Sequence, residues 1–358
     1  MTNVLLHIGM GKSGSSALQK FLSMSPEKYL VKESPYDKIQ YIAINRYGKI
    51  YSGEELKYLS KITPHGYSKS ADMQYLHKLD EENVIKLKKI LQQVSKGGKV
   101  LPVLSSEDWH LKAKKFSAHK LFHRLDIAPS AICYVRNPVE LINSAWWQWH
   151  AWSSIPFNKF IHMWIEKFKI LPESLEYWNT ICKGNLTVVA LPSDIISDFC
   201  KRVGISDIPD QMIKNNVSLP AEVLRFYQRF PDLRSSLGST LDFILTKHIS
   251  FNETYHKTPW VLSNKTIEKI LKETNPAIKQ IAKMFDSDSL YRYENDAKWH
   301  SVEAFSNKKY SSPTYSSNML DKEMLEQMLY DTIYSFVELE KKYKKSRIKL
   351  MKILNDTT

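Results

Sequence analysis

Short apolar runs alternate with amphipathic stretches along most of the chain. Apolar residues run almost without interruption at 4–8, 99–104, 131–135 and 186–191, which is typical of strands buried on both faces of a parallel sheet. Helical patterns fill the intervals between these runs. The alternation predicts an α/β fold of three layers, in which a mainly parallel central sheet is flanked by helices.

The interval 25–98 is long for a single crossover between two strands. It contains a possible short strand at Tyr41–Ile44 and a segment rich in Pro, Gly and Ser at Thr63–Ser70. A helix with an apolar stripe follows, formed by Leu76, Leu79, Leu87, Ile90, Leu91 and Val94. We interpret this interval as an insertion that shapes the substrate side of the fold.

The pattern changes after about residue 290. A polar, turn-rich stretch follows, and residues 321–353 then read as one long helix that ends in KKYKKSRIKLMKIL. We therefore divide the chain into an α/β domain at 1–290 and a polar linker with a basic helix at 291–358. The basic end is compatible with weak contact to an acidic membrane, although lysine at a helix C-terminus is also favoured by the helix dipole.

Composition restricts the partners and the cellular location. The 51 Lys and Arg residues outnumber the 38 Asp and Glu residues, for a net charge of +13, which favours an acidic partner such as a nucleotide or an anionic glycan. The three cysteines show no metal-binding spacing, and two of them read as buried. No apolar stretch approaches the ~20 residues of a membrane span, and the chain enters a strand at once, so we expect a cytoplasmic protein.

The first predicted strand leads into the sequence GMGKSGSSAL, residues 9–18. A helix start offers unpaired N–H groups and the positive end of the helix dipole, so it binds anions readily. Glycine allows close approach to a ligand, and lysine adds a mobile charge. The alternative is a tight strand-to-helix turn with a solvated lysine. The candidate anion-binding residues are Gly11, Lys12, Ser13, Gly14, Ser15 and Ser16. A Walker A loop does not fit, because its first glycine would fall at Leu6.

A second candidate element lies in SAICYVRNPVELINSA, residues 130–145. Arg136 ends an apolar run, Asn137-Pro138 is a favourable helix start, and Ser144 follows on that helix. The planar guanidinium of arginine makes paired, charge-assisted hydrogen bonds with phosphate. The alternative is a surface Arg136 paired with Glu140.

Lys12–Ser16 resembles the Lys-(Ser/Thr)-Gly-(Ser/Thr)-(Ser/Thr) loop of sulfotransferases that use 3′-phosphoadenosine 5′-phosphosulfate (PAPS). The segment from Arg136 to Ser144 resembles the strand–Arg-Asn-Pro–helix–Ser element of the same family, and looser likeness covers 186–194, 215–230 and 258–285. The resemblance spans about residues 3–290 and implies the P-loop-like sulfotransferase fold of bacterial members. It also implies that the first loop wraps the 5′-phosphosulfate, and that Arg136 and Ser144 grip the 3′-phosphate. The late Arg-Lys-Gly turn of many members is not found here.

The resemblance implies transfer of a sulfuryl group from PAPS to a hydroxyl or amine, with adenosine 3′,5′-bisphosphate (PAP) as product. Lys12 is expected to meet the charge that develops on the leaving phosphate, and Ser144 to hold Lys12 back until an acceptor arrives. Glu107, near the end of the apolar run in KVLPVLSSEDWH, is our first candidate for the base, and His110 is the alternate. The alternative for Glu107 and Asp108 is a helix cap.

The acceptor is predicted less directly. The sequence WWQWHAW at 146–152 places Trp146, Trp149 and His150 just after the second element, and tryptophan faces stack on sugar rings. A saccharide or glycolipid acceptor is therefore our expectation, although some of these tryptophans must belong to the core, because they cannot share one helix face. We expect no metal, because His119 and His123, which are four positions apart, are more typical of a solvated helical face. We also expect no nucleic-acid partner.

Two other functions remain open from the sequence. A P-loop nucleotide kinase or NTPase would place Lys12 on a phosphate and use Glu107-Asp108 as the acid at a strand end. A non-enzymatic protein on the sulfotransferase fold would bind a polyanion, with steep salt dependence and no turnover.

Overall fold

The computed structural model describes residues 1–206, 219–237, 240–249, 251, 255–316 and 322–356. The chain divides into two compact units. Unit 1 comprises 1–146, 155–216 and 262–309, and unit 2 comprises 147–154, 217–261 and 310–358. Residues 291–309, part of the expected linker, thus belong to unit 1. Residues 215–218, at the start of the segment 215–230, lie outside the described residues.

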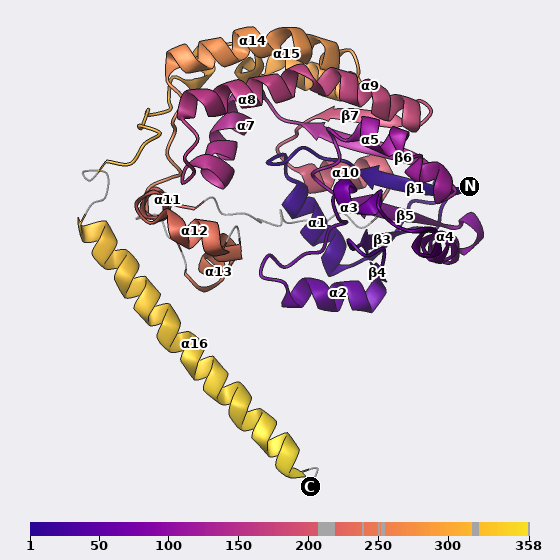
Figure 1. The fold of residues 1–358 in the computed structure, drawn as a ribbon, viewed down its shortest axis with the longest axis horizontal. Coiled ribbons are helices and arrows are strands. Elements are labelled where there is room, and N and C mark those ends of the chain that lie inside the picture. The colour runs from indigo at the N-terminus through magenta and orange to yellow at the C-terminus, as the bar shows by residue number, and fades with distance from the viewer. Residues whose placement is uncertain (207–218, 238–239, 250, 252–254, 317–321, 357–358) are drawn as a thin grey trace. The chain divides into compact units, whose positions relative to one another are not determined.

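Unit 1 is built on a seven-stranded sheet that is mostly parallel (Figure 1). The strand order is β2-β3-β5-β1-β6-β7, and β4 also pairs with β3. β2 and β4 run antiparallel to β3, whereas β3, β5, β1, β6 and β7 are parallel. The strands are β1 (Thr2–His7), β2 (Glu27–Tyr29), β3 (Lys38–Ile44), β4 (Ile50–Ser52), β5 (Val100–Ser105), β6 (Ile127–Val135) and β7 (Leu186–Ala190).

The α/β architecture predicted from the sequence is confirmed. All four apolar runs form strands, and the possible strand at Tyr41–Ile44 is the second half of β3. β2 and β4 were not predicted, because three residues each are too few to show a pattern of alternation.

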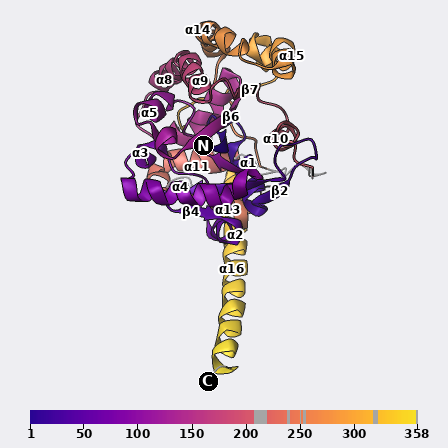
Figure 2. The same ribbon diagram turned by 90° about the vertical axis from the view of Figure 1, so that its right-hand side faces the viewer.

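Helices lie on both faces of the sheet in unit 1 (Figures 1 and 2). They are α1 (Ser15–Met24), α2 (Gly53–Ile62), α3 (Met73–Leu76), α4 (Glu81–Ser95), α5 (Ala113–Ala118), α6 (Leu121–Arg124), α7 (Pro138–Ala145), α8 (Phe157–Lys169), α9 (Leu171–Ile181), α10 (Ile195–Val203), α14 (Asn264–Ala282) and α15 (Ser287–Asn295). α14 packs on α7, α8 and α9, and α15 lies beside β7.

The core of unit 1 explains why its central strands are mainly apolar. Leu5 on β1 packs in one cluster with Leu18 and Leu22 of α1 and with residues of α2 and α10. On the other face of the sheet, Leu104 of β5 and Leu87 of α4 line the same apolar space. Both faces are excluded from water, so neither tolerates the polar residues of a half-exposed strand. Cys133, Cys182 and Cys200 are all buried.

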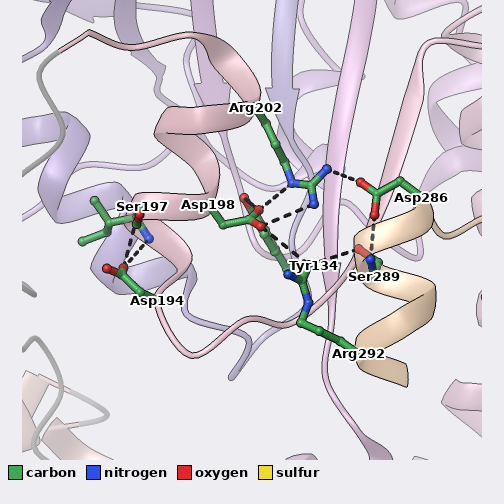
Figure 3. Close-up of polar contacts among 9 residues, drawn as sticks. Tyr134, Asp194, Ser197, Asp198, Arg202, Asp286, Ser289 and Arg292 are labelled. Carbon is green, nitrogen blue, oxygen red and sulfur yellow. Dashed lines mark hydrogen bonds and ion pairs between the residues drawn. The ribbon is translucent and has the colours of Figure 1, made fainter. Parts of the chain in front are cut away.

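A polar cluster joins the late helix α15 to the sheet (Figure 3). Tyr134 of β6 donates a 3.0 Å hydrogen bond to Asp198 of α10. Arg202 bonds the same carboxylate at 2.6 Å and also pairs with Asp286, the N-cap residue of α15. Arg292 of α15 lies 3.6 Å from Asp198. The two arginines and two carboxylates balance one another, which fixes the position of the segment that follows α15.

Unit 2 contains the remaining helices: α11 (Ala221–Arg229), α12 (Pro231–Leu237), α13 (Thr240–His248) and α16 (Lys322–Asp356). The helix expected at 321–353 is therefore present as α16. In the described part of the chain, no helix combines the length and the apolar character needed to cross a membrane.

Candidate functional site

The turn between β1 and α1 lies where the sheet reverses its strand order. β1 pairs with β5 on one side and with β6 on the other. The carboxyl ends of these parallel strands therefore meet at one edge, which is where open α/β sheets bind ligands. Residues 8–14 follow β1 at this edge, Arg136 follows β6, and Glu107 follows β5.

The turn has a backbone that only some residues adopt easily. Lys12 has φ 65° and Gly14 has φ 80°, both in the left-handed region. At Gly9, a Cβ atom would lie 2.6 Å from Ser15 Oγ and 2.9 Å from the ring of His7, so no larger residue fits. Gly14 is the N-cap of α1 and supplies no side chain to cap it. In the first turn of α1, the N–H of Ala17 donates to Gly14 O at 3.0 Å, and no side chain caps the N–H groups before it.

Ser13 carries a hydroxyl that the structure leaves unsatisfied. Its side chain is fully buried, its Oγ has no hydrogen-bond partner among the described residues, and its backbone N–H donates to Met10 O at 3.2 Å. A buried hydroxyl without a partner is costly. It therefore suits a site where a polar ligand supplies the missing bond.

A buried polar cluster lies below the turn. Ser105, the last residue of β5, contacts His7 Nδ1 at 2.7 Å and accepts a 3.0 Å hydrogen bond from Gln19 of α1. Burial lowers the pKa of His7 to about 4, so the ring is neutral at pH 7. These contacts join the ends of β1 and β5 to α1 and thereby hold both ends of the turn.

Arg136 connects the two elements that the sequence singled out. Its Nη1 donates to the backbone O of Lys12 at 3.0 Å and approaches Ser144 Oγ at 3.4 Å. Its Nη2 lies 3.3 Å from Glu140, so the ion pair offered as an alternative is also present. Arg136 Nε is buried without a partner. Asn137 caps α7 by accepting from the backbone N–H of Glu140, as predicted from Asn137-Pro138.

Lys298 adds a second cation to the charged groups around Glu140. It lies in the short helical turn Ala297–Trp299 after α15. Its Nζ lies 3.0 Å from Glu140, the carboxylate that Arg136 also contacts. Although partial burial raises the pKa of Glu140, the charges of Arg136 and Lys298 lower it below the ordinary value. Lys298 was not predicted from the sequence, where the only signal for it is a cation in a polar stretch. Two cations thus share one carboxylate beside the β1–α1 turn.

On the β5 side, Glu107 pairs with a residue of the insertion. Lys69 Nζ lies 2.9 Å from Glu107 and 3.5 Å from Asp108. Although burial lowers the pKa of Lys69, the negative charges of Glu107 and Asp108 raise it above the ordinary value. Neither carboxylate caps a helix, since the next helix begins only at Ala113.

His110 lies against the backbone of the same turn. Its Nδ1 is 2.9 Å from Glu107 O. A carbonyl oxygen only accepts, so Nδ1 carries the proton and Nε2 is left with the lone pair. Burial lowers the pKa of His110 to about 4, which makes it a weak base.

The insertion also reaches the β1–α1 turn. Tyr67 OH lies 3.2 Å from Ser16 Oγ, and the Tyr67 ring contacts the ring of His65, with centroids 4.4 Å apart. Tyr67 and Lys69 are two residues apart, so one short segment touches both Ser16 and Glu107. This segment was predicted to lie on the substrate side, but these side chains were not identified as site residues. The signal for them in the sequence was a His, a Tyr and a Lys in a turn-rich insertion.

The tryptophan cluster does not form one surface. Trp146 is buried in unit 1 and packs edge-on against Phe157 and Phe160. Trp147 is buried in unit 2, where its Nε1 donates to Pro259 O at 2.7 Å. Trp149 is 40% exposed. His150, also in unit 2, is partly buried. Trp146 therefore belongs to a different unit from Trp149 and His150.

The chemistry available at this edge of the sheet follows from these contacts. Lys12, Arg136 and Lys298 supply positive charge, helix α1 supplies N–H donors, and Glu107 supplies a carboxylate. The arrangement suits an anionic ligand with more than one charged group. Within the described residues, no group of three or more His, Cys, Asp or Glu side chains is placed to hold a metal ion.

Comparison with known proteins adds no relative from which a function could be transferred. No protein-family model matches the chain, and no curated protein matches it significantly.

Proposed function

We propose that this protein is a PAPS-dependent sulfotransferase that transfers a sulfuryl group to a hydroxyl or amine of an acceptor. The observation that carries the proposal is the 3.0 Å hydrogen bond from Arg136 to Lys12 O. This bond joins two elements that are 124 residues apart and that separately resemble the family's two phosphate-binding elements. The two elements meet where the strand order of the sheet reverses, and this is the place where open α/β sheets bind ligands.

The finer fold assignment belongs to the same proposal. The sheet with β1 between β5 and β6, and the turn from β1 into α1, are compatible with the P-loop-like sulfotransferase fold.

The residues present fit a nucleotide with phosphate groups at both ends of its ribose. Ser13 Oγ and Arg136 Nε are buried polar atoms without partners in the part of the chain that the structure describes, and α1 has no side-chain cap. Gly11–Ser16 would hold the 5′-phosphosulfate, and Arg136 with Ser144 would hold the 3′-phosphate. Lys298 supplies a cation on the side where the family's Arg-Lys-Gly turn is missing.

When bound, PAPS would supply an activated sulfuryl group. Lys12 places a mobile positive charge at the turn, where it would stabilise the negative charge of a leaving phosphate. Glu107 would accept the proton of the acceptor, with Lys69 holding the carboxylate in position. Ser144 contacts Arg136 at 3.4 Å, so it orients the guanidinium. Its expected contact with Lys12 is part of the proposal.

A saccharide or glycolipid is the proposed acceptor class. The net charge of +13 favours an acidic acceptor. The partly exposed ring of Trp149 is the described tryptophan of the 146–152 cluster best suited to stacking. The insertion segment with His65 and Tyr67 supplies aromatic side chains next to the turn.

Nucleotide binding and transfer together test the proposal. Calorimetry should give tighter binding of PAP than of ATP or ADP, and 35S-labelled PAPS should label at least one acceptor in a panel of glycans, glycolipids and phenols. Tighter binding of ATP with phosphate transfer would identify a kinase or NTPase instead. Salt-sensitive binding of a polyanion without PAP binding or turnover would identify a non-enzymatic protein.

A further inference from the structure

Helix α16 presents two different faces along its length. One face is turned to the rest of unit 2: Asp331 accepts a hydrogen bond from Tyr255 OH, and Ser335 Oγ donates to His248 O at 2.7 Å. The partly buried residues of the helix repeat at intervals of three and four, and they include Met324, Met328, Asp331, Ser335 and Glu338. This face is already covered by α16's own unit.

A second row on α16 is exposed and mainly apolar. Its members repeat at intervals of three, four, three, four and three, and they are Leu329, Thr332, Phe336, Leu339, Tyr343 and Ser346. Leu329 is 60% exposed, Phe336 70%, Leu339 39% and Tyr343 65%. Alternating three- and four-residue intervals are the pattern of a coiled-coil seam. Isolated exposed apolar residues are ordinary, but a continuous row of large ones marks an interaction surface.

The charges along α16 indicate which partner fits this row. Residues 323–340 contain five acidic and no basic residues, whereas residues 341–352 contain seven basic and no acidic residues. A second α16 running antiparallel would place the acidic half of each copy beside the basic half of the other. A parallel pair would place like charges side by side, which is unfavourable.

An anionic membrane fits the same row less well. The apolar residues Leu329, Phe336 and Leu339 lie in the acidic half of the helix. A negatively charged bilayer surface attracts basic segments and repels acidic ones. Insertion of this row would therefore bring the acidic half against the lipid headgroups.

We infer that α16 is a self-association helix that pairs antiparallel with α16 of a second copy of this chain. A two-fold axis near residues 337–338 makes the interface self-complementary. In this register Phe336 faces Leu339 of the second copy, Tyr343 faces Thr332, and Leu329 faces Ser346. Two of these three layers pair a large side chain with a small one, which allows close packing.

Sedimentation and light scattering on the full chain test the pairing. The wild type should form a dimer in the micromolar range. Phe336→Glu combined with Leu339→Glu should raise the dimer dissociation constant by ~100-fold or more, because it buries charge in the seam. Tyr334→Glu is the matched control: Tyr334 is 59% exposed but lies off the row, so this variant should still dimerise. Circular dichroism establishes that each variant is folded. If the double variant is not folded, Leu329→Lys takes its place in the same measurement.

Cysteine cross-linking tests the direction of the helices. Mixed Leu329→Cys and Ser346→Cys chains should cross-link to each other in preference to themselves. Preferential Leu329→Cys self-linking would overturn the antiparallel arrangement. The proposal also fails if the wild type is monomeric throughout the micromolar range, if the double variant dimerises as well as the wild type, or if monomeric wild type binds phosphatidylglycerol vesicles through this row.

Discussion

Lys69 Nζ lies 2.9 Å from a carboxylate oxygen of Glu107, and this ion pair joins the insertion to the end of β5. The same insertion contacts Ser16 of the β1–α1 turn through Tyr67. Glu107 is thereby held near the proposed nucleotide site by a residue outside both of the family-like elements. The pairing holds the carboxylate in one orientation, which suits the proposed role of Glu107 as a general base.

Glu107→Gln should lower turnover by ~100-fold or more and leave PAP binding within ~2-fold of the wild type, because the amide cannot accept the proton of the acceptor. Asp108→Asn is the matched control, since Asp108 lies 3.5 Å from the same lysine but is 51% exposed. Steady-state kinetics at saturating PAPS beside calorimetry measure both quantities. Full activity of Glu107→Gln would move the role of base to His110.

Arg136→Ala should weaken PAP binding by ~2 kcal/mol, or about 30-fold, through loss of a charge-assisted pair with the 3′-phosphate. Binding of adenosine 5′-phosphosulfate, which lacks that phosphate, should barely change. Arg46→Ala removes an exposed arginine elsewhere on the surface and should affect neither nucleotide. Equal losses for the two nucleotides in the Arg136 variant contradict the assignment.

Lys12→Ala should lower turnover by roughly 100-fold and change PAP affinity only modestly, because the serines and N–H groups of the turn already satisfy the resting phosphate. The ammonium group of Lys12 is mobile, so it is suited to follow the negative charge that develops on the leaving phosphate. Saturating-PAPS kinetics and calorimetric binding separate the two effects. An unchanged maximal rate with weakened binding would falsify the role of Lys12 in turnover.

Lys298→Met should weaken PAP binding by roughly 5-fold and spare adenosine 5′-phosphosulfate, because Lys298 supplies positive charge beside Arg136 through their shared contact with Glu140. Lys283→Met, just after α14, provides a lysine change of equal chemistry away from these charged groups. Competition binding with the two nucleotides distinguishes them. If Lys298→Met leaves PAP binding as unchanged as Lys283→Met does, the contact of Lys298 with Glu140 has only a structural role.

Stability should fall as the pH falls from 6.5 to about 4. Burial lowers the pKa of His7 and of His110 to about 4, so in this window the unfolded chain binds protons that the folded chain does not. Each histidine should contribute a slope of about 1.4 kcal/mol in the free energy of unfolding per pH unit. Urea unfolding across this range should show a shallower slope for His7→Gln. Equal slopes for the variant and the wild type would contradict the burial effect.

Much of the central sheet could be predicted because its strands are buried on both faces. Ile132–Val135 is apolar throughout and Val4–Ile8 is apolar except for the buried His7, so their pattern is visible without any neighbour. The helix start at Asn137-Pro138 was predicted for a similar local reason, since a cap depends on residues close in sequence. That Lys12 and Arg136 lie at one site was implied only through a family resemblance, and the hydrogen bond between them was not predicted.

The tryptophans show where a local pattern is insufficient. Trp146 and Trp147 are adjacent in sequence, yet one is buried in unit 1 and the other in unit 2. The helical pattern showed that they could not share one face, but it did not indicate which core would receive each ring. Burial of a side chain depends on what packs against it, and those partners come from distant parts of the chain.

The sequence by itself determined the strands β1, β5, β6 and β7, the turn at Lys12 and the position of Arg136 after a strand, because each follows from residues a few positions apart. The tertiary structure decided that Lys298 and Lys69 join the candidate site, since their partners Glu140 and Glu107 lie 158 and 38 positions away along the chain. It also decided that Leu329, Phe336 and Tyr343 form an exposed row while Asp331 and Ser335 face their own unit. A helix pattern gives the spacing of its faces, but only packing determines which face is covered.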